Sequence, residues 1–368
     1  MLRHTYQKID LGAVRHNIEE LGRFAPGKMR MAIVKADAYG HGALETAKTA
    51  IKAGADWLGV ATPEEAEELA GLKKPILILS PIGEEATKDA VDLGISMCVF
   101  TDEQIETVKK AVKATGKKAK IHIKCDTGMG RIGIRSEDEL NGILDRIDGD
   151  IILEGMFTHF ATADEPDLTY AEKQLGQFRK YVALVKSRGF SPIVHAANSA
   201  AIFSLDCSDF DMVRMGIAMY GYLPCPGFDA KGADLRPAMS VVSSISHIKK
   251  VRVGDSISYG RHFTAERESI IATVPIGYAD GYMRANSNKA CAIVNGVRVP
   301  VCGNVCMDQI MLDITDAGKA EIGDEVVLMG TQGDTVVSAD ELAGYAGTIS
   351  YEILTSFKGR MPRVYLNG

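Results

Sequence analysis

Lys35 stands where a buried strand is expected to end. The four residues before it, MAIV at 31–34, are apolar, and ADAYGHG follows with Tyr39 beside a glycine. Burial at such a position disfavours the charged form of a lysine, and its neutral amine can then act as a nucleophile or a base. Chemistry on a carbonyl cofactor or substrate is therefore one interpretation. A solvated lysine that merely ends a strand is the other.

Further polar side chains stand at the expected ends of later strands. They are Lys124 with Asp126, Arg131 in the TGMGR turn, His159, Asn198 with Ser199, and Arg214 followed by Gly216 and Ile217. In a barrel of parallel strands these ends share one face, so the side chains would converge on one mouth. The turns after the last two strands of such barrels commonly hold a phosphate. A lysine beside a phosphate site points to pyridoxal phosphate as a cofactor.

The elements that would position these residues alternate along the first two thirds of the chain. Strands are predicted at 28–34, 56–61, 75–80, 96–100, 119–126, 153–160, 193–198 and 211–214. Amphipathic helices are predicted between them, most clearly at 41–54, 101–116 and 168–189. Several strands are nearly continuous apolar runs, which is typical of strands buried on both faces. Eight such units favour a closed (β/α)8 barrel of the TIM type over an open doubly wound sheet.

Helix ends carry their own signals. Capping boxes are predicted for Thr62 with Glu65, Thr101 with Gln104, Ser136 with Glu139, and Ser338 with Glu341. Gly54, Gly94 and Gly116 stand where helices should end. The last helix is predicted to run from Ser338 towards Gly359.

After about residue 236 the pattern becomes β-like. SVVSSISHIKKV, ESIIATVPIGYADGY, KACAIV and VRVPV are strand-like segments, and Asn295-Gly296 between the last two is a strong hairpin signal. We therefore predict two domains: a barrel at 1–235 and a mainly β domain at 236–368.

Composition excludes several classes of protein. The 368 residues are 46% hydrophobic and 24% charged, which is ordinary for a soluble globular chain. A net charge of −6 disfavours a nucleic-acid partner, and neither a secretory signal core nor a membrane-spanning run is evident. The seven cysteines lack CxxC spacing, so reduced thiols, no metal site and a cytoplasmic location are expected.

One motif suggests a nucleotide site. Gly128, Gly130 and Gly133 fit GxGxxG and follow a predicted strand. A dinucleotide fingerprint needs its third glycine in the opening of a helix, whereas the helix start predicted here is at Ser136. Nicotinamide or flavin binding is therefore disfavoured.

The ordered set of motifs resembles the alanine racemase family. VKADAYGHG, DTGMGRIG, THFATADE, HAANSAA, VRMGIAMYG, VPIGYADGY, VCMDQ and TISYEIL span residues 34–354 and both predicted domains. A small one-domain barrel that binds pyridoxal phosphate would account for Lys35 but not for residues 236–368. The resemblance implies a pyridoxal-phosphate-dependent isomerase that interconverts L- and D-alanine and supplies D-alanine for peptidoglycan.

The resemblance also implies catalytic roles. Racemisation removes the Cα proton from one face and returns one to the other, so two acid/base groups are needed. Lys35, which in the family holds the cofactor as an aldimine, and Tyr259 match these two bases. The family's tyrosine acts in the partner's site, so a homodimer is implied. His159 and Arg214 match a network that could favour the phenolate, and Arg214 also matches the arginine that faces the pyridine nitrogen.

Binding roles follow from the same resemblance. The matches to cofactor-binding groups are Tyr39, Asn198, Ser199, Arg214, Gly216, Ile217 and Tyr351. Arg131 and the Met307 backbone match the contacts to the substrate carboxylate, for which a bidentate arginine is well suited. Many members carbamylate the lysine that matches Lys124, and the resemblance predicts a carbamate here that orients Arg131. A chloride ion or Asp126 could balance the charge instead.

Some positions depart from the family pattern. Asn304 stands where many members carry arginine, Tyr6 and Lys8 replace tryptophan and glutamate, and the MYGYLPCPG stretch is unusual. These differences leave the specificity open between alanine and serine or a broader range, although a bulky Tyr351 favours a methyl side chain. A non-catalytic protein that binds pyridoxal phosphate is the alternative of a different class. A fold-related basic amino-acid decarboxylase is disfavoured by the motifs.

Overall fold

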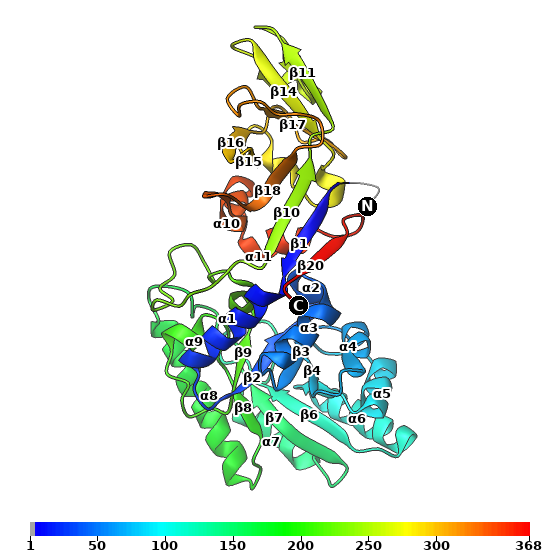
Figure 1. Ribbon diagram of the computed structural model, residues 1–368. Coiled ribbons are helices and arrows are strands. Elements are labelled where there is room, and N and C mark those ends of the chain that lie inside the picture. Colours follow the sequence, from blue (N-terminus) through cyan, green and yellow to red (C-terminus); the bar gives the residue numbers. More distant parts are fainter. Residues whose placement is uncertain (1–3) are drawn as a thin grey trace. The chain divides into compact units, whose positions relative to one another are not determined.

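The computed structural model describes residues 4–368, which form two compact units (Figure 1). The first comprises Val14–Ala38 and Ala43–Arg236. The second comprises the N-terminal segment through Ala13, Tyr39–Gly42 and Pro237–Gly368. The sequence-based division at 235/236 did not include this exchange of segments. It arises because the first strand pairs inside the sheet of the second unit.

The first unit is built on a closed barrel of eight parallel strands, which confirms the predicted fold class. In order the strands are β2 (Met29–Ile33), β3 (Trp57–Val60), β4 (Ile76–Ile78), β5 (Ser96–Val99), β6 (Ala119–Lys124), β7 (Ile151–Phe157), β8 (Ile193–His195) and β9 (Met212–Met215). Pairing of β9 with β2, with Met31 opposite Arg214, closes the barrel. The carboxyl ends of all eight strands therefore lie at one mouth.

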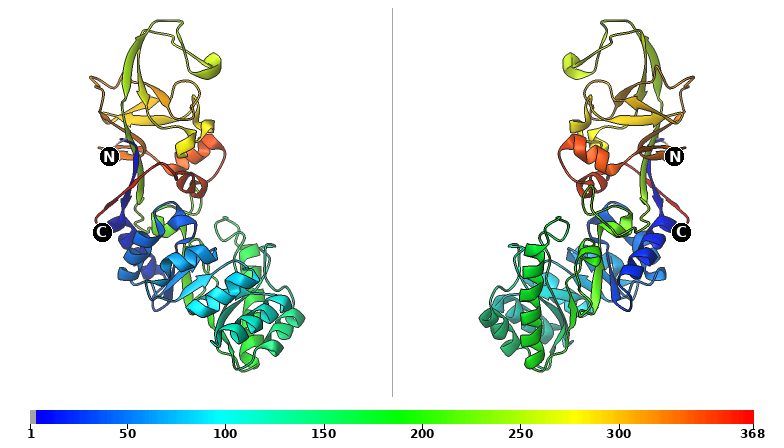
Figure 2. Two further views of the ribbon diagram at one scale, coloured as in Figure 1. Left: turned by 90° about the vertical axis from the view of Figure 1, so that its right-hand side faces the viewer. Right: turned by 90° about the vertical axis from the view of Figure 1, so that its left-hand side faces the viewer.

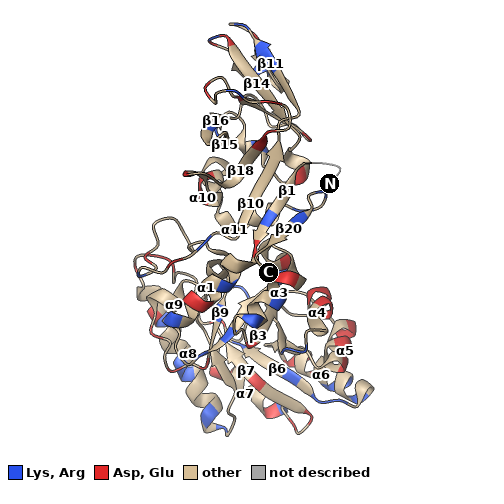
Figure 3. Ribbon diagram, in the orientation of Figure 1, with Lys and Arg blue, Asp and Glu red and all other residues tan. Residues whose placement is uncertain are grey.

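Helices cover the outside of the barrel strands (Figure 2). They are α1 (Leu11–Phe24), α3 (Ala43–Lys52), α4 (Pro63–Ala70), α5 (Glu84–Leu93), α6 (Asp102–Thr115), α7 (Glu137–Arg146), α8 (Thr169–Ser187) and α9 (Ala201–Ser204), with a 3-10 turn η1 (Ile217–Tyr220). The first turns of α4 and α5 each carry two glutamates (Figure 3). Negative charge there is favourable because the N-terminal end of a helix is partially positive.

The predicted capping boxes form fully at two of four sites. Thr62 with Glu65 and Thr101 with Gln104 exchange both hydrogen bonds. Ser136 caps its helix, but the Glu139 carboxylate accepts from the Arg135 N–H at 2.6 Å, so the reciprocal prediction was wrong there.

The prediction of one long last helix was also wrong. Ser338 caps α10 (Ala339–Ala346), and the Glu341 side chain contacts Arg298 instead of closing a box. The helix stops at Gly347, whose φ of 72° is in the left-handed region, and a separate α11 (Ser350–Ser356) follows.

The second unit is mainly β, as predicted. Its main sheet has the order β16–β15–β18–β10–β1–β20, with β19 added on β18. These strands are β1 (Tyr6–Asp10), β10 (Met239–Ser244), β15 (Cys291–Val294), β16 (Val297–Pro300), β18 (Glu325–Gln332), β19 (Thr335–Val337) and β20 (Arg363–Leu366). β1 pairs antiparallel with β10 and parallel with β20.

Smaller elements complete this unit. A three-stranded sheet joins β11 (His247–Val251), β14 (Ser269–Val274) and β17 (Ile310–Asp313), and a ribbon joins β12 (Ser256–Ile257) to β13 (Phe263–Thr264). Three 3-10 turns are η2 (Tyr259–Arg261), η3 (Tyr278–Asp280) and η4 (Arg284–Asn286). The Asn295-Gly296 hairpin joins β15 to β16, which confirms the prediction, and both turn residues have positive φ, as a type I′ turn requires.

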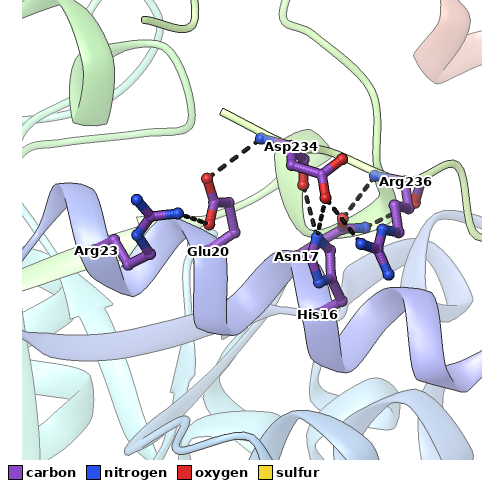
Figure 4. Close-up of polar contacts among 6 residues, drawn as sticks. All are labelled: His16, Asn17, Glu20, Arg23, Asp234 and Arg236. Carbon is purple, nitrogen blue, oxygen red and sulfur yellow. Dashed lines mark hydrogen bonds and ion pairs between the residues drawn. The ribbon is translucent and has the colours of Figure 1, made fainter. Parts of the chain in front are cut away.

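Helix α1 holds the last segment of the first unit in place (Figure 4). The buried Asn17 amide accepts from the Arg236 N–H and donates to the Arg236 carbonyl, both at 2.8 Å. Glu20 accepts from the Asp234 N–H at 3.2 Å and pairs with Arg23 at 2.7 Å. These contacts fix the chain just before β10. Across residues 4–368, no helix combines the length and apolar character that crossing a membrane requires.

Candidate active site

Lys35 begins a left-handed turn at the end of β2. The element α2 (Lys35–Tyr39) has φ near 52° and ψ near 49° at Ala36, Asp37 and Ala38, so it is left-handed although its hydrogen-bonding is helical. Such a conformation costs about 1–2 kcal/mol per non-glycine residue, so other contacts must hold it. The loop then passes through Gly40, where a Cβ would lie 2.4 Å from the Leu354 carbonyl oxygen. Only glycine fits that close approach.

Glu65 is one of the groups that hold this turn. Its carboxylate accepts from the Ala36 N–H at 2.6 Å and from the Ala61 N–H at 2.7 Å, while it also closes the capping box of α4. Asp37 accepts from the Ala43 N–H at 2.8 Å and so ties the turn to α3. The capping box of Thr62 and Glu65 could be predicted from the sequence. The hydrogen bond from Ala36 to Glu65 joins two βα units, and no local sequence pattern indicates it.

The amine of Lys35 is prepared for chemistry by its surroundings. Burial, followed by the charge of Arg131, lowers its pKa, and Glu65 opposes this shift in part. A lowered pKa raises the fraction of Lys35 that is a neutral, nucleophilic amine near neutral pH.

Arg214 is the centre of a hydrogen-bond network at the end of β9. It is 4% exposed. Its Nη2 donates to the carbonyls of Thr158 and Ala196, both at 2.8 Å, and to His159 Nδ1 at 3.2 Å. Burial lowers the Arg214 pKa to about 10, which leaves the guanidinium charged. The structure thus brings together Arg214 and His159, as the sequence suggested.

His159 is neutral in this arrangement. Burial and the charge of Arg214 lower its pKa well below the usual value. Because Arg214 can only donate, His159 Nδ1 accepts, and the proton of the neutral ring lies on Nε2. His159 can therefore offer an N–H to another group.

Lys124 is 2% exposed at the end of β6. Its Nζ donates to the Cys125 carbonyl at 2.6 Å and lies 5.6 Å from the centre of the Phe157 ring. Burial lowers its pKa to about 8. His122, two residues earlier on the same face of the strand, contacts His195 of β8, so Lys124 shares this inward-facing side.

The glycine-rich turn after β6 is organised by Asp126. Its carboxylate accepts from the N–H groups of Gly128 and Gly130 at 3.1 and 2.9 Å. All three motif glycines have positive φ, and helix α7 begins only after its cap at Ser136. The turn therefore presents the exposed Arg131, whose charge lowers the pKa values of Lys35 and His159. The predicted contact between Lys124 and Arg131 stays a prediction.

The loops after β8 and β9 are joined through Ser199. Its buried Oγ accepts from the Gly216 N–H at 3.0 Å and from the Ala218 N–H at 3.3 Å, which leaves its own hydrogen to donate. Asn198 accepts from the Ala201 N–H at 2.9 Å and so holds the start of α9. Ile217 is buried at the start of η1.

The remaining predicted residues belong to the second unit. The buried Tyr39 and the half-buried Tyr351 have ring centres 6.0 Å apart, and burial raises the Tyr39 pKa to about 12. Tyr259 and Met307 are 72% and 53% exposed. Asn304 donates from Nδ2 to the Tyr259 carbonyl at 2.7 Å and thereby supports the turn.

The barrel mouth of the first unit carries a lysine with a lowered pKa, and the second unit carries an exposed tyrosine and methionine; these side chains are suited to amine chemistry. Family models agree: the alanine racemase N-terminal domain matches residues 9–224, and the C-terminal domain matches residues 238–365. The chain belongs to the alanine racemase family, whose members are isomerases.

Individual relatives support this assignment over the full length. The alanine racemase of Symbiobacterium thermophilum is 42% identical over 99% of this chain and 97% of its own. That of Cutibacterium acnes is 44% identical, with 97% and 96% covered. The crystal structure of alanine racemase from Bacillus anthracis with bound L-Ala-P is 40% identical, covers 99% of this chain and 95% of its own, and superposes with a TM-score of 0.94.

Proposed function

We propose that this chain is a pyridoxal-phosphate-dependent racemase that interconverts L- and D-alanine, with Lys35 and Tyr259 as its two bases. The observation that carries the proposal is the Lys35 amine, placed at a barrel strand end with a lowered pKa. When bound, the cofactor supplies an electron sink for the charge that develops at Cα.

The donor set around Lys35 fits this cofactor and an amino-acid substrate. Within residues 4–368, no carboxylate forms an ion pair with Lys35, Lys124, Arg131 or Arg214. An excess of positive charge at one mouth is suited to a phosphate and a carboxylate. Ser199, Gly216 and Ile217 would hold the phosphate, and Lys35 would attach the cofactor covalently.

Tyr259 is proposed to serve the site of a second copy, so the active form would be a homodimer. In support, its side chain is largely exposed, as is Met307, the other residue matched to a substrate contact. His159 would then offer its Nε2–H to the tyrosine oxygen while Nδ1 holds Arg214.

The decisive experiment incubates the purified protein and pyridoxal phosphate with single L-amino acids in deuterium oxide. We expect D-alanine to form with deuterium at Cα. Comparable conversion of L-serine would indicate a broader racemase, and a bound chromophore without Cα exchange would indicate a non-catalytic protein.

We also propose that Lys124 is carbamylated: its neutral amine adds to carbon dioxide, forms a C–N bond and releases one proton. In support, its pKa of about 8 leaves a sizeable neutral fraction near neutral pH. The resulting anion would orient Arg131. Lys124→Ala should lose activity and regain part of it with added small carboxylates. A crystal grown with bicarbonate that shows a bare ammonium group would overturn the proposal.

The physiological role that we propose is supply of D-alanine for peptidoglycan in the cytoplasm. Seven free thiols are in keeping with a reducing compartment. Depletion of the protein should create a requirement for external D-alanine.

A further inference from the structure

A line of four polar side chains runs from Arg214 into the barrel. Arg214 Nη1 lies 3.1 Å from His195 Nδ1, and His195 Nε2 lies 3.0 Å from His122 Nδ1. His122 Nε2 then faces the Glu154 carboxylate at 3.6 Å. The four residues come from β9, β8, β6 and β7, so the line connects strands that are distant in sequence.

The direction of each proton in this line follows from the Arg214 end, and the charge of Glu154 at the other end favours the same arrangement. Arg214 can only donate, so His195 Nδ1 accepts and its proton lies on Nε2. His195 Nε2–H then donates to His122 Nδ1, and the His122 proton lies on Nε2, towards Glu154. Burial lowers the pKa of both histidines, which keeps the rings neutral.

The far end of the line is an anchored anion. Glu154 accepts from Ser96 Oγ and lies 3.5 Å from Lys120 Nζ. The His122 and Ser96 contacts lower its pKa against the effect of burial, so it is ionised. Among residues 4–368 no carboxylate pairs directly with Arg214, and Glu154 is the acid at the end of this line, 3.6 Å beyond the last hydrogen-bonded ring.

The barrel makes room for this line at the expense of apolar packing. A Cβ on Gly155 would lie 2.2 Å from His122 Nδ1, so the ring occupies space that any larger residue in β7 would fill. Phe157 stacks on His195 at 4.9 Å, and Trp57 packs edge-on against His122 at 5.2 Å. Buried polar groups are costly unless they are satisfied. The hydrogen bonds of His195 to Arg214 and His122 restrict both rings, whereas His122 Nε2 is beyond hydrogen-bond distance of Glu154 and is attracted to it electrostatically at 3.6 Å.

We propose that His122 and Glu154 are positioning residues that fix His195 as an Nε2-protonated acceptor and thereby hold the Arg214 guanidinium in one orientation. The effect on catalysis rests on the proposed function and on the resemblance that matches Arg214 to the arginine facing the pyridine nitrogen of the cofactor. The proton arrangement itself is a property of this chain alone.

The first arm of the test is nitrogen-15 NMR of histidine-labelled protein with pyridoxal phosphate. The charged and titratable groups that face the two rings are Arg214, Lys124 and Glu154. We expect His122 and His195 to carry a proton on Nε2 and none on Nδ1, from mildly acidic to mildly alkaline pH. A proton on Nδ1 of either ring, or an imidazolium, would overturn the inference.

The second arm measures racemisation. Glu154→Leu should lower kcat about tenfold with KM nearly unchanged, the low end of the effect seen when the partner behind a metal-bound imidazole is removed. Glu154→Gln retains an acceptor and should recover most of kcat. Lys120→Met removes the exposed ion pair and leaves the line intact, so it should change kcat less than about twofold.

Gly155→Ala provides an independent probe if Glu154→Leu fails to fold, because it displaces the His122 ring without removing a hydrogen-bonding group. An unchanged kcat in folded Glu154→Leu or Gly155→Ala protein would refute the positioning role. If the wild-type protein racemises nothing, the proposed function fails, whereas the NMR arm still decides the proton arrangement.

Discussion

The two groups of candidate site residues are built in different ways. In the barrel, Arg214 and Lys124 are almost fully buried, and carbonyls, imidazoles and an aromatic ring surround them. In the second unit, Tyr259 and Met307 are largely exposed, and their turns are supported through backbone atoms. The barrel residues thus have their charge and orientation determined within one chain, whereas the proposed role of Tyr259 requires another surface. The sharpest tests are substitutions that distinguish residues acting within their own chain from residues acting in the site of a second chain.

The largest effect is expected at Lys35. Lys35→Ala removes both the proposed covalent anchor and one base, so racemisation should fall by at least about ten-thousandfold. Borohydride reduction of the wild-type protein followed by peptide mass mapping should place the label on Lys35. Recovery of the label on another lysine would contradict the assignment.

Tyr259→Phe should reduce racemisation on the order of a thousandfold, because one of the two acid/base groups is lost. Cofactor binding should persist, and Cα exchange should be less impaired with D-alanine than with L-alanine. Tyr278→Phe, another exposed tyrosine of the same unit, is the matched control and should remain active.

Mixing Lys35→Ala chains with Tyr259→Phe chains then tests whether a site is shared between subunits. Partial recovery of activity is expected, since one site of each mixed dimer would have both bases. Proven mixed dimers that remain inactive would exclude sharing.

Burial of Lys124 should appear in the pH dependence of stability. Its folded-state pKa of about 8 lies below the ordinary value of 10.5, so the unfolded chain binds more protons between these pH values. The free energy of unfolding should therefore rise with pH across this window, by up to about 3 kcal/mol in carbonate-free buffer. Lys124→Met should lack this rise in denaturant titrations. A wild-type curve that parallels the variant's would show that the lysine is not buried as a free amine.

The smallest effect is expected at Glu65. Glu65→Gln removes the negative charge that opposes the lowered Lys35 pKa, so that pKa should fall further. The pH profile for chemical labelling of the Lys35 amine in cofactor-free protein should shift to lower pH, and kcat should change several-fold. Glu64→Gln alters the exposed neighbour and should leave both unchanged. A profile that does not move in Glu65→Gln would remove Glu65 from the control of Lys35.

Local patterns in the sequence were sufficient for the barrel, the β-rich second unit and most strand ends. Eight apolar runs separated by capped helices predict parallel strands. These strand and helix signals can be read from sequence because each one depends on residues within a single βα unit. The Asn295-Gly296 hairpin and the positions of Lys35, Lys124, His159 and Arg214 at strand ends follow from the same local rules. The resemblance to family motifs then indicated which of these residues have catalytic or binding roles.

Tertiary structure decided the features that join segments far apart in the chain. The sequence-based division placed β1 in the barrel domain, but its backbone pairs with β10 and β20. Local sequence does not indicate which strand will pair with which. Ser136 and Ser338 show the same limit: Glu139 and Glu341 had the right spacing, but nearby groups competed for their carboxylates. Barrel closure brings Glu65 to Ala36 and places Arg214, His195 and His122 within hydrogen-bonding reach of one another. It also sets Glu154 3.6 Å from the last ring of that line.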